Sequence, residues 1–459
     1  MASPLLNIPE DVLRLILASL SSANLWAVCL THTALRTLAE PFLYSHIQWI
    51  WDRSHNPPIV PFLRTILRRP ELALRVKSLI LEGNTLGSSA YHKNRHKYTK
   101  FPVNETDLDE LIKCIKGMNV PYSALWIHEI RAGTMDAFVA LLLFQLPRLK
   151  RLQLSESFTN QSRLIGMVLR TRLCDEPKDS YTPSFDQLQD VSSLYFDPGF
   201  YIRHYTAARN TADVLPFFYL PSVERITAAI DNPTVFAWPA AHAPNPSRLA
   251  SLDLAMIREG NLGHVLSVAK ELKTLRWEWF YREDLQSGLV TDIIDLDQIA
   301  ADLSHVRETL TDLTIEAESG TLESDLQPHV RIKGKFRAFS DLNALKRLKV
   351  PLPLLMGLSP FESKANCLAE TLPKGMESLT ITDDLYLQER YEWEDFHLFE
   401  ILQIWLQDWK ISTPHLQEFH LYLKLMACGE WGPEMRERLK NLGVQVGIHV
   451  KITKIAGQM

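Results

Sequence analysis

The sequence is poor in the residues and motifs that carry chemistry. Its five cysteines, Cys29, Cys114, Cys174, Cys367 and Cys428, are far apart, which excludes a paired-thiolate zinc motif and a disulfide framework. There is no phosphate-cradling Gly-rich loop, nucleophile elbow or His-Glu-x-x-His pair, and 18 glycines in 459 residues leave few places for backbone that closely approaches a ligand. We therefore expect reduced thiols inside a cell, no cofactor, no metal and no enzymatic activity.

Strong net charge and long apolar runs are also missing. The chain has 49 basic and 54 acidic side chains, a formal net charge of -5, so it has no global field that would attract nucleic acid. The longest apolar stretches, 138–144 and 350–358, are far shorter than the ~20 residues that cross a bilayer. Glu10, Asp11 and Arg14 interrupt the apolar N-terminus, unlike a secretory signal. We expect a soluble protein of the cytoplasm, the nucleus or both, with no nucleic-acid or membrane partner.

The first 48 residues predict a small helical module. Val12, Ile16 and Leu20 recur every four residues, which gives a helix a broad apolar face. Pro9 suits the first turn of that helix, and two shorter helical patterns follow, one of them beginning at Leu25. A module of this size covers little of its own apolar surface. It therefore needs a partner protein or a neighbouring domain.

A set of apolar positions in this module resembles an F-box, in the style of fungal F-box proteins. The matching residues are Leu6-x-Ile8-Pro9-Glu10-x-Val12-x-x-x-Ile16-x-x-x-Leu20, then Leu25, Val28 and Cys29, and the exit Ala39-Glu40-Pro41-Phe42-Leu43-Tyr44. Leu30 stands where the family commonly has a basic residue. The resemblance implies docking onto the Skp adaptor of an SCF-type (cullin-RING) ubiquitin ligase, through Leu6, Ile8, Pro9, Val12, Ile16, Leu20, Leu25 and Val28. The alternative is an ordinary amphipathic cap on the domain that follows.

Beyond residue 50 a short apolar pattern repeats. It has an apolar residue, two polar ones and then two alternating apolar residues, as in Leu149-Lys-Arg-Leu152-Gln-Leu154. Nine clear copies begin at Val76, Leu149, Val191, Leu249, Leu272, Leu310, Leu345, Met376 and Leu416, and looser ones lie at Ser123–Ile127, Val223–Ile226 and Val444–Val446. The mean spacing is about 33 residues, longer than a minimal leucine-rich repeat. Each copy predicts a half-buried strand.

The intervals between the copies predict helices, at 135–146, 262–269, 299–306 and 396–409. Strand and helix in alternation predict a parallel sheet, and the polar residues between the apolar strand positions predict that one face of that sheet is solvated. Residues 70–450 are similar to leucine-rich repeats of an irregular form. The expected α/β fold is a helical F-box-like module (1–48), a linker or cap (49–74), and an irregular leucine-rich-repeat solenoid (75–459) with the parallel sheet on its concave side and helices on its convex side.

Three other groups of residues are weaker site candidates. His92 and His96 share the spacing of a helical metal pair, but a polar, basic loop surrounds them, and a solvated loop is the favoured interpretation. The acidic run from Asp383 to Asp395 is also interpreted as a solvated loop. In the aromatic cluster, alternation predicts that Trp277 and Trp279 point inward, while Phe280 and Tyr281 are candidates for an interface.

These observations favour a binding protein. The first hypothesis is a substrate receptor of an SCF-type ubiquitin ligase, with a Skp-type adaptor and an unknown target protein as its partners. The second is a leucine-rich-repeat interaction scaffold unconnected to ubiquitination, in which the helical module only caps the repeats. The third, an α/β enzyme, requires convergent buried polar groups at strand ends, and continuous apolar strands would suit it better than the polar ones found here.

Overall fold

The computed structural model describes residues 8–51, 56–83, 100–155, 163–175, 185–193, 211–282, 290–320, 328–335, 337, 339–362, 367–423 and 431–454. The chain divides into two compact units. Unit 1 contains residues 1–223 and 239–241, and unit 2 contains residues 224–238 and 242–459. Within the described part of the chain, no helix combines the length and the apolar character needed to cross a membrane.

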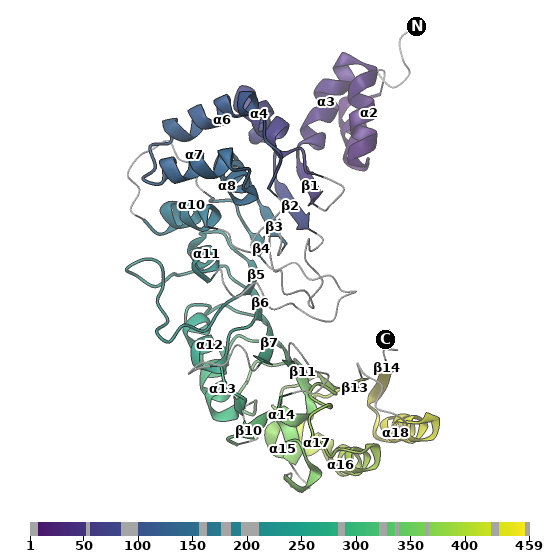
Figure 1. The fold of residues 1–459 in the computed structure, drawn as a ribbon. Helices are drawn as coiled ribbons and strands as arrows, with labels where there is room; N and C mark the ends of the chain where they lie inside the picture. Colours follow the sequence, from purple (N-terminus) through teal and green to yellow (C-terminus); the bar gives the residue numbers. More distant parts are fainter. Residues whose placement is uncertain are drawn as a thin grey trace. The chain divides into compact units, whose positions relative to one another are not determined.

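Unit 1 begins with three helices and continues with alternating strands and helices. In chain order its elements are α1 (Glu10–Ala18), α2 (Ser22–Thr31), α3 (Thr33–Leu43), β1 (His46–Trp51), α4 (Ile59–Arg68), α5 (Pro70–Ala73), β2 (Ser78–Gly83), α6 (Glu105–Gly117), α7 (Ser123–Arg131), α8 (Met135–Gln145), β3 (Arg151–Leu154), α10 (Leu164–Leu173), β4 (Asp190–Ser192), α11 (Thr211–Val214) and the 3₁₀ helix η3 (Leu215–Tyr219). Strands β1 to β4 pair in parallel and in chain order. Helices α4, α6, α7, α8 and α10 form a layer beside them (Figure 1).

Unit 2 repeats the same alternation. Its elements are β5 (Arg225–Ala229), β6 (Ser251–Ala255), α12 (Glu259–Leu266), β7 (Thr274–Arg282), β8 (Ile293–Asp295), α13 (Leu296–Leu303), η5 (Ser304–Val306), β9 (Asp312–Gly320), β10 (Arg331–Lys333), β11 (Arg347–Pro351), α14 (Leu352–Met356), η6 (Pro360–Glu362), α15 (Cys367–Thr371), β12 (Ser378–Thr382), α16 (Asp395–Gln407), α17 (Trp409–Ser412), β13 (Glu418–Leu423), α18 (Pro433–Val446) and β14 (His449–Lys454). The strands pair in parallel in the order β5-β6-β7-β9-β11-β12-β13-β14, and β8 and β10 form a separate parallel pair.

The repeated apolar positions form the core. Leu252, Leu275, Leu313, Leu348 and Leu379 occupy one register row of unit 2, and each is at most 2% exposed. Residues between them along each strand are partly exposed, as in β9, whose burial alternates strictly. This alternation is what period-two strands with one covered face produce. The predicted parallel sheet with one solvated face is therefore confirmed. The concave curvature of that face stays a prediction.

Strand β4 begins earlier than the repeat pattern predicts. The pattern placed Leu194 at the core position, but Val191 pairs with Leu152 of β3, and Leu188 is fully buried. Leu188-x-x-Val191 and Val191-x-x-Leu194 share the first spacing of the pattern, although Ser193 stands at the last apolar position of the first of them. The structure uses the first of them, and Leu194 lies outside the described residues.

Two of the looser copies are helical, not extended. Trp126 and Ile130 are both buried at the four-residue spacing that a helix needs, so Ser123–Ile127 belongs to α7. Val444 and Val446 lie in the last turn of α18, which Gly447 ends in the left-handed conformation (φ 83). The strand predicted there follows this glycine instead, as β14. The third looser copy is confirmed, because Ile226 lies in β5.

The first strand lies across the predicted boundary between the module (1–48) and the linker or cap (49–74). His46–Trp51 forms β1, which pairs with β2 along its whole length. The predicted linker or cap contains α4 and α5. Sequence alternation in His46–Trp51 is weak because two tryptophans and two isoleucines crowd it, and the strand is visible only from its pairing.

Arg258 is the one fully buried arginine among the described residues of unit 2. It donates to both carboxylate oxygens of Glu259, at 2.9 Å each, and to the carbonyl oxygens of Thr291 (2.8 Å) and Ile293 (2.7 Å). Its guanidinium also lies 4.3 Å from the ring centre of Trp279. These contacts hold the segment that leads into β8 against α12. A buried guanidinium needs such complete pairing because its desolvation is costly.

Asp302 of α13 is a buried carboxylate without a cationic partner among the described residues. Gln298 Nε2 donates to its Oδ1 (2.8 Å), whereas its Oδ2 has no hydrogen-bond partner in that part of the chain. Gly263 lets α12 approach it closely, because a Cβ at Gly263 would lie only 2.5 Å from Oδ1. Burial, followed by repulsion from Glu259, raises the pKa of Asp302 to about 7.

We expect Asp302→Asn to stabilise unit 2 at pH 8 and to do so much less at pH 5. A carboxylate whose pKa is higher in the folded than in the unfolded state makes the protein less stable as pH rises from about 4 through 7. The amide has no charge to desolvate and keeps the oxygen that accepts from Gln298. Thermal unfolding followed by circular dichroism at both pH values measures the difference, expected to be a few degrees at pH 8. The exposed Glu271→Gln is the control, and an unchanged pH profile in Asp302→Asn would contradict the assignment.

Candidate interaction surfaces

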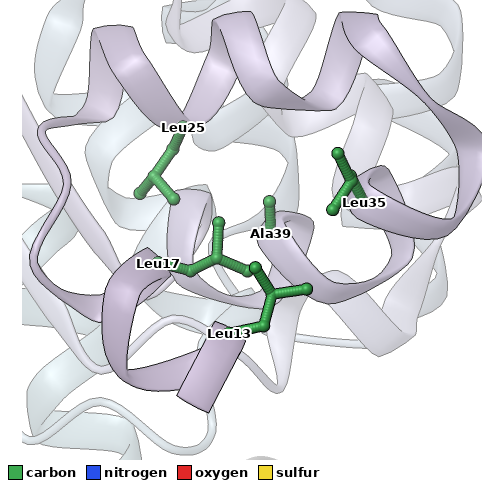
Figure 2. Packing of buried hydrophobic residues seen from close by; sticks show 5 residues of the cluster. All are labelled: Leu13, Leu17, Leu25, Leu35 and Ala39. Atoms are coloured by element: carbon green, nitrogen blue, oxygen red, sulfur yellow. The ribbon is translucent and has the colours of Figure 1, made fainter. Parts of the chain in front are cut away.

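The N-terminal helices form a module with a small core of its own. Leu13, Leu17, Leu25, Leu35 and Ala39, which come from all three helices, point toward one another (Figure 2) and are at most 5% exposed. The helix ends follow local rules, since Ser21 Oγ accepts from the backbone N–H of Asn24 (3.3 Å) at the start of α2, and His32 Nδ1 accepts from that of Ala34 (3.1 Å) at the start of α3. The module is thus a folded unit.

A wide apolar surface is left outside this core. Val12, Leu15 and Ile16 of α1 are 45, 73 and 39% exposed, and Trp26 and Leu30 of α2 are 60 and 66% exposed. The three α1 residues share one side of the helix, because positions three and four apart lie together. We use the name apolar face of the module for these five exposed side chains together, three on α1 and two on α2. Large apolar side chains grouped on so small a unit are typical of an interaction site.

The residues predicted to contact an adaptor divide between this face and the core. Val12 and Ile16 are exposed, and Pro9 is exposed at the start of α1. Ile8, Leu20 and Val28 are partly buried and pack against the core. Leu6 lies outside the described residues.

Leu25 requires a correction. At 5% exposure it is a core residue of the module (Figure 2), so its surface is already covered by the chain itself. The sequence reasoning also missed Leu15, Trp26 and Leu30, the most exposed members of the apolar face. The helical spacing of these residues indicates a shared side, since Leu15 lies three residues from Val12 and Leu30 lies four residues from Trp26. The family pattern does not include these positions among its apolar contacts.

A bidentate ion pair joins the module to the repeats of unit 1. Arg69 donates from Nη1 and Nη2 to the two carboxylate oxygens of Glu40, at 2.8 Å each. The hydrogen bond from Arg69 holds the pKa of Glu40 below its usual value. Tyr44 stacks on Phe62 with ring centres 5.9 Å apart. This attachment uses α3 and leaves the apolar face of α1 and α2 exposed.

The open face of the sheet in unit 2 carries a polar network. Arg276 Nη2 lies 2.8 Å from Glu316 Oε2, and Lys349 Nζ lies 3.0 Å from Glu316 Oε1. Lys349 also lies 5.0 Å from the ring centre of Tyr422. These side chains come from β7, β9, β11 and β13, and the charges on β7, β9 and β11 alternate in sign. Charge complementarity is the means by which such a face can bind a partner.

His420 continues that face on β13. Its Nε2 lies 3.0 Å from Thr453 Oγ1. Burial and the nearby Lys451 and Lys349 lower its pKa, because both desolvation and positive neighbours disfavour the imidazolium. The lowered pKa favours the neutral imidazole, which contributes a hydrogen-bonding ring to this face.

The other sequence candidates have mixed outcomes. Trp277 and Trp279 are fully buried, as predicted, but Phe280 and Tyr281 are only 3% exposed and are not interface residues. Both faces of β7 are covered at this end, so strand alternation cannot distinguish core residues from interface residues among these four aromatic side chains.

The acidic run is partly buried. Asp383 and Asp384 are buried, and Asp384 Oδ2 accepts from the backbone N–H of Ala317 (3.1 Å). The solvated-loop interpretation is therefore wrong for these two residues. His92 and His96 lie outside the described residues.

Comparison with known proteins identifies the repeats. A model of the leucine-rich repeat domain matches residues 51–451, which begin at the last residue of β1 and end within β14. The three N-terminal helices precede this match. No curated protein matches the chain. Because the match covers most of the sequence and agrees with the repeated parallel strands, the chain belongs to the leucine-rich repeat family and is built as a protein-interaction scaffold.

Proposed function

We propose that this protein is the substrate receptor of an SCF-type ubiquitin ligase. The apolar face of the module docks onto a Skp-type adaptor, and the open sheet face of the repeats binds a target protein. The observation that carries the proposal is the group of exposed apolar side chains on a module that has its own core. The resemblance of its sequence to an F-box supplies the identity of the partner.

In this proposal the chain contributes binding and no catalysis. A receptor raises the effective concentration of its target beside a charged ubiquitin-conjugating enzyme, and other subunits carry out the transfer. A receptor also needs its module held on the repeats, and the salt bridge between Glu40 and Arg69 provides that attachment under either function. Such a receptor works in the cytoplasm or the nucleus.

A truncation tests adaptor docking directly. Residues 1–44 can be removed without cutting β1, which starts at His46. We expect the full chain to bind a purified Skp-type adaptor and the truncated chain to show no binding by isothermal titration calorimetry, because the apolar face is gone. The truncated chain is expected to keep a cooperative thermal transition, since the repeats have a core separate from that of the module.

The alternative function is a scaffold in which the module only caps the repeats. The contacts of Glu40 and Tyr44 with the first repeats favour it. In that case the full chain does not bind the adaptor, and removal of residues 1–44 lowers the unfolding temperature markedly. Failure of the full chain to bind the adaptor would overturn the ligase proposal.

A further inference from the structure

A hollow with aromatic walls lies at the carboxyl ends of β12 and β13 in unit 2. It opens to solvent, and its own volume is about 30 Å³, which is room for one group the size of a water molecule or an ammonium. Four aromatic residues line it: Tyr386, Tyr391, Trp393 and Trp431. Trp393 Nε1 donates to the carbonyl oxygen of Gly357 (2.9 Å), so a hydrogen bond fixes this ring in the wall.

Carboxylates outnumber cations around the hollow. Asp383, Glu394 and Asp395 line it together with a single lysine, Lys454 of β14, so the charged lining is net negative. Asp395 Oδ2 accepts from the backbone N–H of Trp431 (3.3 Å), which ties one carboxylate to an aromatic wall. Glu394 is exposed at the rim. Aromatic faces and carboxylates attract cations, and both strengthen when water is excluded.

A hydroxyl group in the lining lacks a partner. Thr382, the last residue of β12, is fully buried and lines the hollow. Its Oγ1 makes no hydrogen bond within the described part of the chain. A buried hydroxyl without a partner is costly, and a ligand that carries an N–H group at this position would satisfy it.

We propose that this hollow binds the ammonium group of a lysine side chain presented by the target protein. The ammonium group occupies the hollow beside the aromatic rings, the carboxylates neutralise its charge, and Thr382 Oγ1 accepts one ammonium N–H. The inference rests on the proposed role of the repeats in target binding and is independent of adaptor docking. Lysine suits the site better than arginine. A guanidinium has five N–H donors that need acceptors, and the buried part of the hollow offers one acceptor, the hydroxyl of Thr382.

The probe for this site is Nα-acetyl-lysine N-methylamide, titrated into the full chain and followed by saturation-transfer NMR. We expect a Kd on the order of 1 mM. The norleucine analogue, which lacks the ammonium, is expected to give no detectable binding, and the arginine and trimethyl-lysine analogues are expected to bind at least several-fold more weakly. Adaptor binding measured on the same preparation separates failure at this site from failure of the proposed function.

Two matched pairs of variants locate the bound probe. Glu394→Lys should weaken binding about tenfold by placing a cation at the rim. Glu400→Lys, exposed on α16, the helix that begins just after Glu394, should leave it within twofold. Thr382→Val should weaken binding several-fold, while Thr380→Val on the same strand should not. Lys454→Gln should strengthen binding, because it removes the cation already present in the lining.

Several outcomes would overturn the proposal. Equal binding of the norleucine analogue would show a merely apolar hollow, and no binding of any analogue would show that it is not a ligand site. Tighter binding of the trimethyl-lysine or arginine analogue would exclude an unmodified lysine as its ligand. Equal effects of Glu394→Lys and Glu400→Lys would place the probe elsewhere.

Discussion

Replacing Ile16 with aspartate is expected to weaken the binding of a Skp-type adaptor at least about 100-fold. Ile16 belongs to the apolar face of the module and is 39% exposed, so part of its side chain is open to a partner. A carboxylate at this position would be desolvated in the complex without a cation to pair with it. The measurement is isothermal titration calorimetry with the purified adaptor.

A second variant separates docking from folding of the module. Leu15 is 73% exposed, so Leu15→Asp leaves the core of Leu13 and Leu17 untouched and should still weaken adaptor binding strongly. Thr37→Asp, on an exposed position of α3, is the matched control and should bind like the unaltered chain. Unchanged affinity in both Ile16→Asp and Leu15→Asp would show that the adaptor does not use this face.

Replacing Arg258 with methionine is expected to destabilise unit 2 by about 3–5 kcal/mol. The substitution keeps most of the side-chain volume but leaves Glu259 buried without its cation, and it removes the donors to the carbonyl oxygens of Thr291 and Ile293. The segment leading into β8 should loosen first. Urea unfolding followed by near-ultraviolet circular dichroism measures the loss, and hydrogen exchange of Ile293–Asp295 reports the local effect.

The control for this variant is an ion pair at the surface. Arg248 and Glu224 are 3.0 Å apart but about half exposed, so Arg248→Met should cost less than about 1 kcal/mol. The double variant Arg258→Met with Glu259→Gln should recover part of the lost stability, because no buried charge is then left unpaired. A loss in Arg258→Met no larger than in Arg248→Met would contradict the structural role of Arg258.

The parts of the fold that the sequence predicts well are those set by local periodicity. Leu252-x-Leu254 and Leu275-x-Trp277 are strands because alternate side chains meet one covered face. The same rule fails at Val191, where two overlapping apolar spacings compete and only pairing with β3 decides the register. It fails around Trp126 because the apolar run there is short, and a short apolar run fits a strand and a helix equally well.

The candidate sites depend on longer-range information. The sequence predicts an apolar face on α1, yet Leu25 and Trp26 are neighbours with opposite exposure, and only the packing of α2 against α1 and α3 assigns them. The aromatic hollow brings together Thr382, Tyr391 and Trp431, which no motif links. The buried Asp383 and Asp384 looked like part of a solvated acidic run, because charge patterning says nothing about which carboxylates a fold encloses.

The order of strands in unit 2 affects how the protein can be made. From β5 to β14, each strand of the main sheet adds to the one synthesised before it. A nascent chain emerging from the ribosome can therefore dock each new segment on a template that already exists, without waiting for residues still to be translated. If translation pauses between two repeats, the strands already made can keep their native pairing in a shorter sheet, without forming non-native strand pairs.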